Sequence, residues 1–154
     1  GQRLTGKIGY DLIEEAGWEV THVGGLTLGA DPVTYAIAHH STARERVLDG
    51  FTVRKEPKGH GTGRQIEGGL PTNARVVIVE DAVTSGASVI RAIEAVREHG
   101  ATIVGVICLV DREEGGRAKL DELGVPLLTV FTGSELLTAA KEAAAGASAD
   151  PAGT

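Results

Sequence analysis

Two adjacent acids, Glu80 and Asp81, follow a run of apolar residues, and a loop of small residues comes directly after them. The whole segment, Val76 to Ser88, reads VVIVEDAVTSGAS. Carboxylates repel phosphate but accept hydrogen bonds from sugar hydroxyls, whereas the backbone N–H groups of a tight loop before a helix bind phosphate. An acidic pair beside such a loop therefore predicts a site for a ribose 5-phosphate.

The alternative interpretation of this segment is an ordinary turn between a strand and a helix. The two acids would then be solvated, and a serine would cap the helix. The two common phosphate-binding patterns, GxxxxGKS/T and GxGxxG, do not occur in the chain. The phosphate interpretation thus depends on the acidic pair and the small residues after it.

A second candidate segment, from Arg54 to Arg64, is rich in charge and glycine. Its four basic residues and one acid give a local charge of +3 in a chain whose net charge is −6. Glycine at every second position from Gly59 to Gly63 gives the backbone freedom to move. A mobile cationic loop suits a reaction whose leaving group gains negative charge, although a solvated hairpin tip has the same composition.

The elements that position these segments follow from an alternation of apolar and amphipathic runs. This alternation predicts an α/β fold with a mostly parallel central sheet, helices on both faces and a β-hairpin arm that carries the cationic loop. We predict strands at 19–23, 51–54, 65–67, 75–79, 102–110 and 126–131. We predict helices at 4–16, 88–98 and 117–123, and two more that begin at Asp31 and at Ser134.

The composition sets the broad class of the protein. The chain has 154 residues, enough for one domain, and we expect residues 1–142 to form it and residues 143–154 to form a flexible tail. It contains no Met and begins at Gly1, so we expect an N-terminal segment to precede it.

Charge and apolar patterning exclude two kinds of partner. With 15 basic and 21 acidic residues, the chain is unsuited to coating nucleic acid. No apolar run approaches the roughly 18 residues that a membrane span needs, so we expect a cytoplasmic protein without membrane contacts. The single cysteine, Cys108, lies in an apolar run and is predicted to be a core residue.

Four segments together resemble the orotate phosphoribosyltransferases, a family of type I phosphoribosyltransferases. VVIVEDAVTSGAS resembles their motif for phosphoribosyl diphosphate (PRPP), and VRKEPKGHGTG (53–63) resembles their mobile catalytic loop. VDREEGG (110–116) is similar to the family's Asp-Arg turn, and VGGLTLGADP (23–32) is similar to its diphosphate-side loop. The likeness extends from Leu4 to about Leu137.

The resemblance implies Mg²⁺-dependent transfer of the phosphoribosyl group from PRPP to orotate, a step of pyrimidine synthesis. It implies a catalytic role for Lys58 and His60, and orotate binding by Thr84 and Arg112. It further implies a homodimer whose mobile loop acts in the partner's site, and Mg²⁺ that is held mainly through PRPP rather than by protein ligands. The residues expected to bind PRPP are Arg54, Lys55, Lys58, His60, Glu80, Asp81, Ala82, Val83, Thr84, Ser85, Gly86, Ala87 and Ser88.

The chain departs from the family pattern at three points. Leu28 stands where some relatives have Lys, Glu80 stands where many have Asp, and the family's N-terminal segment has no counterpart. Two alternatives therefore stay open. One is a type I phosphoribosyltransferase for a purine or uracil, and the other is a regulator that senses PRPP without catalysing transfer.

Overall fold

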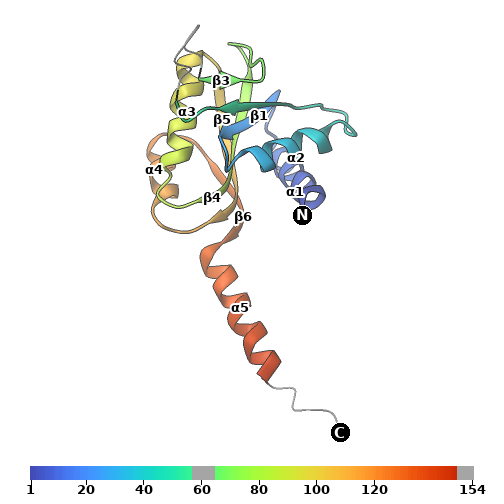
Figure 1. Ribbon diagram of the computed structural model, residues 1–154, viewed down its shortest axis with the longest axis vertical. Coiled ribbons are helices and arrows are strands. Elements are labelled where there is room, and N and C mark those ends of the chain that lie inside the picture. Colours follow the sequence, from blue (N-terminus) through green and yellow to red (C-terminus); the bar gives the residue numbers. More distant parts are fainter. Residues whose placement is uncertain (57–64, 149–154) are drawn as a thin grey trace.

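A six-stranded sheet forms the centre of the molecule, in the order β3-β2-β1-β4-β5-β6 (Figure 1). The computed structural model describes residues 1–56 and 65–148. Every neighbouring pair of strands is parallel except β2 and β3, which are antiparallel. The strands are β1 (His22–Leu26), β2 (Asp49–Val53), β3 (Ile66–Glu67), β4 (Arg75–Val83), β5 (Thr102–Asp111) and β6 (Leu127–Thr132).

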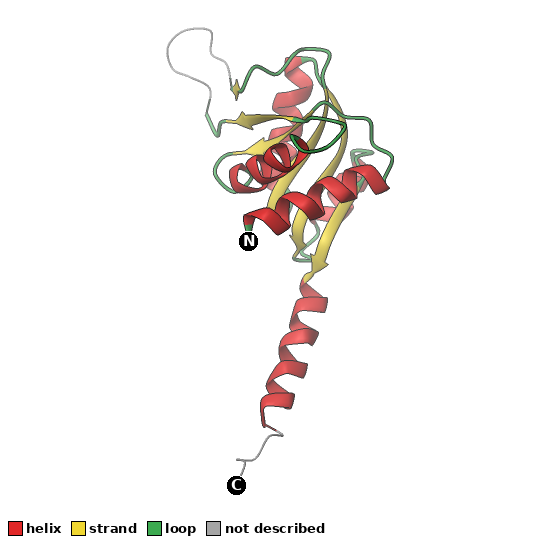
Figure 2. Ribbon diagram, turned by 90° about the vertical axis from the view of Figure 1, so that its right-hand side faces the viewer, coloured by secondary structure: helices red, strands yellow, loops and turns green. Residues whose placement is uncertain are grey.

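Helices cover both faces of this sheet (Figure 2). The helices against the sheet are α1 (Gln2–Glu15), α2 (Asp31–Ser41), α3 (Ala87–His99) and α4 (Gly116–Glu122), and the fifth helix is α5 (Gly133–Ser148). Val77 and Val79 of β4 pack in one apolar cluster with residues of α1 and α2. Val76 and Ile78 of the same strand pack in a second cluster with residues of α3 and α4. Because β4 is buried on both faces, its sequence is continuously apolar, and the predicted α/β fold is confirmed.

Two strands, β1 and β4, differ from their predicted ranges by three or more residues at a boundary, and the other strands differ by one or two. β4 continues past residue 79 to Val83, because its pairing with β5 continues as far as Val83 and Asp111. The acidic pair consequently lies inside the strand rather than after it. β1 begins at His22 and includes Gly24 and Gly25, whose glycines we interpreted as the end of the strand.

Close packing explains why glycine occurs inside β1. A Cβ atom on Gly25 would lie 2.3 Å from the carbonyl oxygen of Val79 in β4. A Cβ atom on Gly24 would lie 2.2 Å from the carbonyl oxygen of Phe51 in β2. These glycines allow the neighbouring backbones to approach, so here glycine marks tight packing and not a turn.

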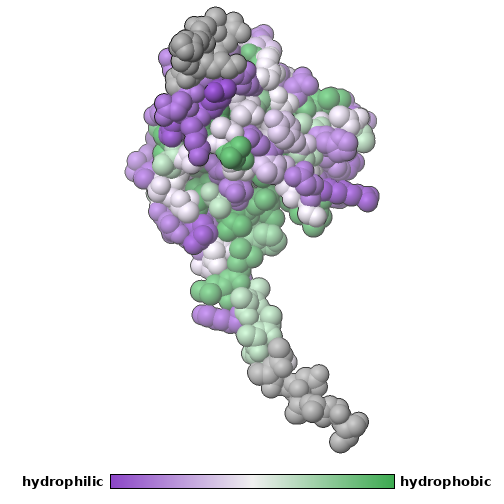
Figure 3. Space-filling model, in the orientation of Figure 1, coloured by the Kyte–Doolittle hydropathy of each residue, from purple (hydrophilic) through white to green (hydrophobic). Residues whose placement is uncertain are grey.

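The C-terminal helix α5 projects away from the sheet (Figure 1). It extends through residues 143–148, where the sequence predicts a tail, because alanine is the strongest helix former. That this segment is flexible stays a prediction, as does the division into 1–142 and 143–154. Apolar surface lies where β6 meets α5 (Figure 3), and Phe131, Leu136 and Leu137 are the large exposed apolar residues there. Within the described part of the chain, no helix combines the length and the apolar character needed to cross a membrane.

Candidate active site

The site lies at the edge of the sheet where the parallel strands β1, β2, β4 and β5 end. In α/β proteins this carboxyl edge is the usual position of a ligand. The turn after β1 lies against the acidic pair at the end of β4. A Cβ atom on Gly29 would be 2.7 Å from Oε1 of Glu80 and 3.1 Å from Oδ1 of Asp81. The diphosphate-side loop and the PRPP motif, recognised separately in the sequence, therefore adjoin.

The two acids lie in different environments. Glu80 is buried, with 5% of its surface exposed, whereas Asp81 is exposed. The backbone N–H of Asp81 donates to Oε1 of Glu80 at 3.3 Å, and the N–H of Ala82 donates to Oδ1 of Asp81 at 2.7 Å. Burial, reinforced by the side-chain hydrogen bond and the charge of Asp81, raises the pKa of Glu80 to about 7. Glu80 is thus partly protonated at neutral pH.

The loop after β4 is held through its carbonyl groups. The backbone N–H of Gly116 donates to the carbonyl of Thr84 at 3.0 Å, and Nζ of Lys119 donates to the carbonyl of Ser85 at 2.9 Å. Both donors belong to α4. The carbonyl oxygens of Thr84 and Ser85 therefore accept hydrogen bonds from α4.

The N–H groups of the same loop are free to bind an anion. Gly86 adopts a left-handed conformation with φ of 80° and lies directly before α3. Among the described residues, no hydrogen bond from the backbone N–H groups of residues 85–88 is formed. With its carbonyls tied to α4 and its N–H groups free at a helix N-terminus, the loop has the polarity that binds phosphate. The expected side chains of Thr84, Ser85, Ala87 and Ser88 are exposed there.

Val83, the last residue of β4, packs in the core and bonds the turn after β5. Its side chain is buried in the core, with 1% of the residue exposed. Its carbonyl accepts a hydrogen bond from the N–H of Arg112 at 2.8 Å. Its contact with PRPP, like that of Ala82 beside it in β4, stays a prediction.

Two of the expected cations line a hollow next to the diphosphate-side loop. Arg54 and Lys55 border a cavity of about 580 Å³ together with Thr27 and Leu28. The guanidinium of Arg54 lies 3.7 Å from Glu67 on the returning strand of the hairpin. The structure thus brings Arg54 and Lys55 to the place where the sequence predicts a diphosphate. Lys58 and His60 lie outside the described residues, so their roles stay predictions.

Arg112 follows β5 directly, and its N–H bonds the carbonyl of Val83, the last residue of β4 before the phosphate-binding loop. Its guanidinium is exposed and lies 3.5 Å from the carboxylate of Glu114. This ion pair is the arrangement expected of a solvated turn, and it also leaves the guanidinium accessible. The predicted contact with orotate is compatible with this position and is not tested by it.

Sequence reasoning missed the role of three residues that hold the site together. Asp111 is buried beside Arg112, Arg117 pairs with it, and Lys119 fixes the loop carbonyl. Asp111 lies in the recognised Asp-Arg turn, and the apolar run before it gave a further signal, because a carboxylate at the end of a buried strand needs a partner. The partners themselves lie on α4 and carry no motif.

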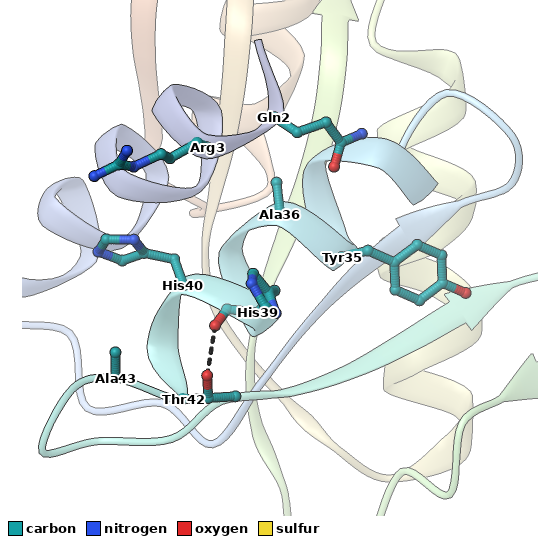
Figure 4. Close-up of a pocket in the computed structure, with 8 residues that line it drawn as sticks. All are labelled: Gln2, Arg3, Tyr35, Ala36, His39, His40, Thr42 and Ala43. Atoms are coloured by element: carbon teal, nitrogen blue, oxygen red, sulfur yellow. Dashed lines mark hydrogen bonds between the residues drawn. The ribbon is translucent and has the colours of Figure 1, made fainter.

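A separate hollow of about 540 Å³ lies between the start of α1 and the end of α2 (Figure 4). Arg3, His39 and His40 line it, and His40 accepts a hydrogen bond from Arg44 at 3.0 Å. None of the site residues predicted from the sequence lines this hollow.

The fold and the site define a phosphoribosyltransferase, and the family description "Phosphoribosyl transferase domain" matches residues 3–124. Among curated proteins, the orotate phosphoribosyltransferase of Aquifex aeolicus is 50% identical over 137 residues, which are 89% of this chain and 74% of that protein. That of Streptomyces coelicolor is 47% identical over 134 residues, covering 86% of this chain and 72% of the relative.

Solved structures agree with these relatives. The crystal structure of Mycobacterium tuberculosis orotate phosphoribosyltransferase in complex with PRPP superposes with a TM-score of 0.76 at 38% identity. The match covers 88% of this chain and 75% of that one. The chain belongs to the orotate phosphoribosyltransferase family and is an enzyme of this type, which confirms the resemblance found in its sequence.

Proposed function

We propose that the protein transfers the 5-phosphoribosyl group of PRPP to orotate, giving orotidine 5′-monophosphate and diphosphate in cytoplasmic pyrimidine synthesis. The observation that carries this proposal is the loop of residues 84–88. Its carbonyls bind α4, its N–H groups are free, and it follows an acidic pair on the same strand. The curated relatives described above are named orotate phosphoribosyltransferases, which supports orotate as the acceptor.

The acidic pair and the loop bind the two ends of the ribose phosphate. The N–H groups and hydroxyls of Thr84 to Ser88 hold the 5′-phosphate at the N-terminus of α3. Glu80 and Asp81 accept hydrogen bonds from the ribose hydroxyls, the role that suits carboxylates beside a sugar. Asp81 is exposed and meets substrate directly, whereas the buried Glu80 must first lose its proton to act as a charged acceptor.

The diphosphate is the leaving group, and cations surround its predicted position. Arg54 and Lys55, which follow β2, line the cavity beside the diphosphate-side loop, although the acids Asp31, Glu56 and Glu67 line it as well. Lys58 and His60 of the catalytic loop, which lie outside the described residues, are expected to add two more cations. Mg²⁺, when bound with PRPP, neutralises part of the diphosphate charge. Among the described residues no three His, Cys, Asp or Glu side chains form a metal site. Mg²⁺ is expected to be held mainly through the phosphates of PRPP.

The transfer requires no nucleophile from the protein. The bond from ribose C1 to the diphosphate oxygen breaks as the bond from C1 to orotate N1 forms, through an oxocarbenium-like state, and the N1 proton of orotate passes to the departing diphosphate or to water. Negative charge then grows on the leaving diphosphate, where Lys58 and His60 stabilise it. Arg112 and Thr84 hold orotate, because a planar guanidinium can bind its carboxylate or carbonyl edge with two hydrogen bonds.

We also propose a symmetric homodimer in which the catalytic loop reaches the partner's site, as the family resemblance implies. Mixing Lys58→Ala protomers with Asp81→Asn protomers tests it, because a mixed dimer would contain one intact composite site. Recovered activity is the expected result. Loss of activity in a verified mixed dimer would refute a loop that acts in the partner's site.

The proposed reaction is tested by following orotate absorbance with PRPP and Mg²⁺. We expect consumption only when all three are present with the protein, and diphosphate should appear in equal amount. Adenine, hypoxanthine and uracil serve as competing acceptors. Consumption of one of these bases instead would establish a different phosphoribosyltransferase, and PRPP binding without any transfer would indicate a regulator.

A further inference from the structure

We propose that Asp111 and Arg117 are positioning residues for the transfer, and this inference rests on the function proposed above. Their ion pair closes the turn from Asp111 to Arg117. That turn holds the acceptor-binding Arg112 at one end and the phosphate-binding loop at the other. The pair thereby sets the distance between the two substrates.

The carboxylate of Asp111 is fully engaged. Asp111 is 2% exposed, and its Oδ2 accepts a hydrogen bond from Nε of Arg117 at 2.9 Å. Its Oδ1 accepts from the backbone N–H of Glu113 at 2.9 Å. Nη1 of Arg117 also donates to the carbonyl of Leu127 in β6 at 3.0 Å. One buried carboxylate therefore joins the end of β5, the turn, α4 and β6.

The conformation of the turn needs such support. Glu113 has φ of 60°, the left-handed region that residues other than glycine rarely adopt. Its carboxylate binds the N–H of Ser134 at the start of α5, at 2.7 Å. A backbone of this kind persists only where its surroundings determine it. Two contacts hold Glu113 in this conformation: its N–H bonds Asp111, and its carboxylate accepts from Ser134.

The turn is bonded at one end to the last residue of β4 and at the other end to the phosphate-binding loop. The N–H of Arg112 donates to the carbonyl of Val83, and the N–H of Gly116 donates to the carbonyl of Thr84. Gly116 packs so closely that an added Cβ would lie 2.5 Å from Cγ1 of Val83 and 3.0 Å from the backbone nitrogen of Gly86. A shift of the turn consequently moves the loop, and it moves Arg112 with it.

The chain offers a matched control for this pair. Arg46 donates to a backbone carbonyl, that of Trp18, at 2.9 Å, and it lies 3.4 Å from Glu14. Its side chain is 41% exposed, against 43% for Arg117. Trp18 precedes β1, so Arg46 lies toward the opposite edge of the sheet from the site. Each arginine thus binds one backbone carbonyl and one carboxylate, although the carboxylate partner of Arg46 is exposed and that of Arg117 is buried. Only Arg117 is tied to the active-site turn.

The experiment compares Arg117→Gln, Arg117→Lys and Arg46→Gln in the full chain. Melting temperature, kcat, the two KM values and the PRPP dissociation constant are measured for each. Misplacement of about 1 Å can cost roughly 100-fold in rate. We therefore expect Arg117→Gln to lower kcat/KM for orotate by roughly 10- to 100-fold and to weaken PRPP binding as well. Arg117→Lys should restore part of both, and Arg46→Gln should change only the melting temperature.

Equal kinetics in Arg117→Gln and Arg46→Gln would overturn the inference, because Arg117 would then be merely structural. If Arg117→Gln does not fold, the isosteric Asp111→Asn is measured in the same way, with the same expected and contrary results. If the unaltered protein does not consume orotate, the proposed function fails. The PRPP dissociation constants of the variants then decide the inference separately.

Discussion

Protonation of Glu80 is expected to make PRPP binding depend on pH. Its pKa of about 7 is set by burial next to Asp81, so the carboxylate gains a proton within the physiological range. A protonated carboxyl is a weaker acceptor for the ribose hydroxyls than an ionised one. PRPP affinity should therefore fall as the pH falls through 7.

The size of the effect follows from that pKa. If only the ionised form binds well, the apparent dissociation constant scales with one plus the ratio of protonated to ionised Glu80. With a pKa of about 7, the constant should rise about tenfold between about pH 8 and about pH 6. Binding should also release protons, which calorimetry in two buffers of different ionisation enthalpy detects.

Glu80→Gln is the control for this prediction. Its amide has the same shape and does not titrate, whereas the phosphates of PRPP titrate equally in both proteins. Titration calorimetry at several pH values should show a flatter dependence in the variant than in the unaltered protein, with weaker binding at about pH 8. If the PRPP dissociation constant depends on pH equally in the two proteins, Glu80 does not titrate during PRPP binding. The reasoning from its burial would then be wrong.

Substitutions at three further residues test the proposed contacts. Asp81→Asn should weaken PRPP binding by roughly 10- to 100-fold, since charged hydrogen bonds contribute about 1.5–3 kcal/mol; an unchanged constant in calorimetry would remove the acidic pair from the site. Lys58→Ala should lower kcat far more than it raises the KM for PRPP, because its cation meets the leaving group in the transition state; steady-state kinetics with normal kcat and a raised KM would make it a ground-state anchor. Arg112→Ala should cut kcat/KM for orotate by roughly 10- to 100-fold with PRPP binding nearly unchanged. Arg112→Lys should restore part of it, and an unaltered rate with orotate would favour another acceptor base.

The sequence predicted those parts of the molecule whose chemistry is local in the chain. The acidic pair, the small-residue loop and the start of α3 are consecutive, so the residues from Glu80 to Ser88 could be recognised together. The order of strands and helices followed from apolar periodicity for the same reason. Their boundaries were less accurate where glycine served close packing, as in Gly24 and Gly25 of β1.

The supports of the site could not be read from the sequence. Lys119 binds the carbonyl of Ser85, 34 positions earlier in the chain, and Arg117 binds the carbonyl of Leu127 on the next strand. Such contacts depend on where the helix α4 docks, and a lone basic residue on a helix is usually solvated. The pKa of Glu80 was equally hidden, because it depends on the continuation of β4 into the site.

Replacing Glu80 and replacing Arg117 should therefore change the stability of the fold in opposite directions. The pKa of Glu80 is raised from 4.5 to about 7, so the folded state holds its proton where the unfolded state has lost it. Stability therefore falls as the pH rises from about 4.5 to about 7, by at most roughly 3 kcal/mol, and stays low above that range. Glu80→Gln lacks this titration. In urea unfolding at about pH 8 it should be more stable than the unaltered protein, although it binds PRPP less well, whereas Arg117→Gln should lose both stability and activity. If Glu80→Gln is instead less stable at about pH 8, the ionised carboxylate stabilises the fold. Glu80 would then be buried for the sake of the fold and not for substrate binding.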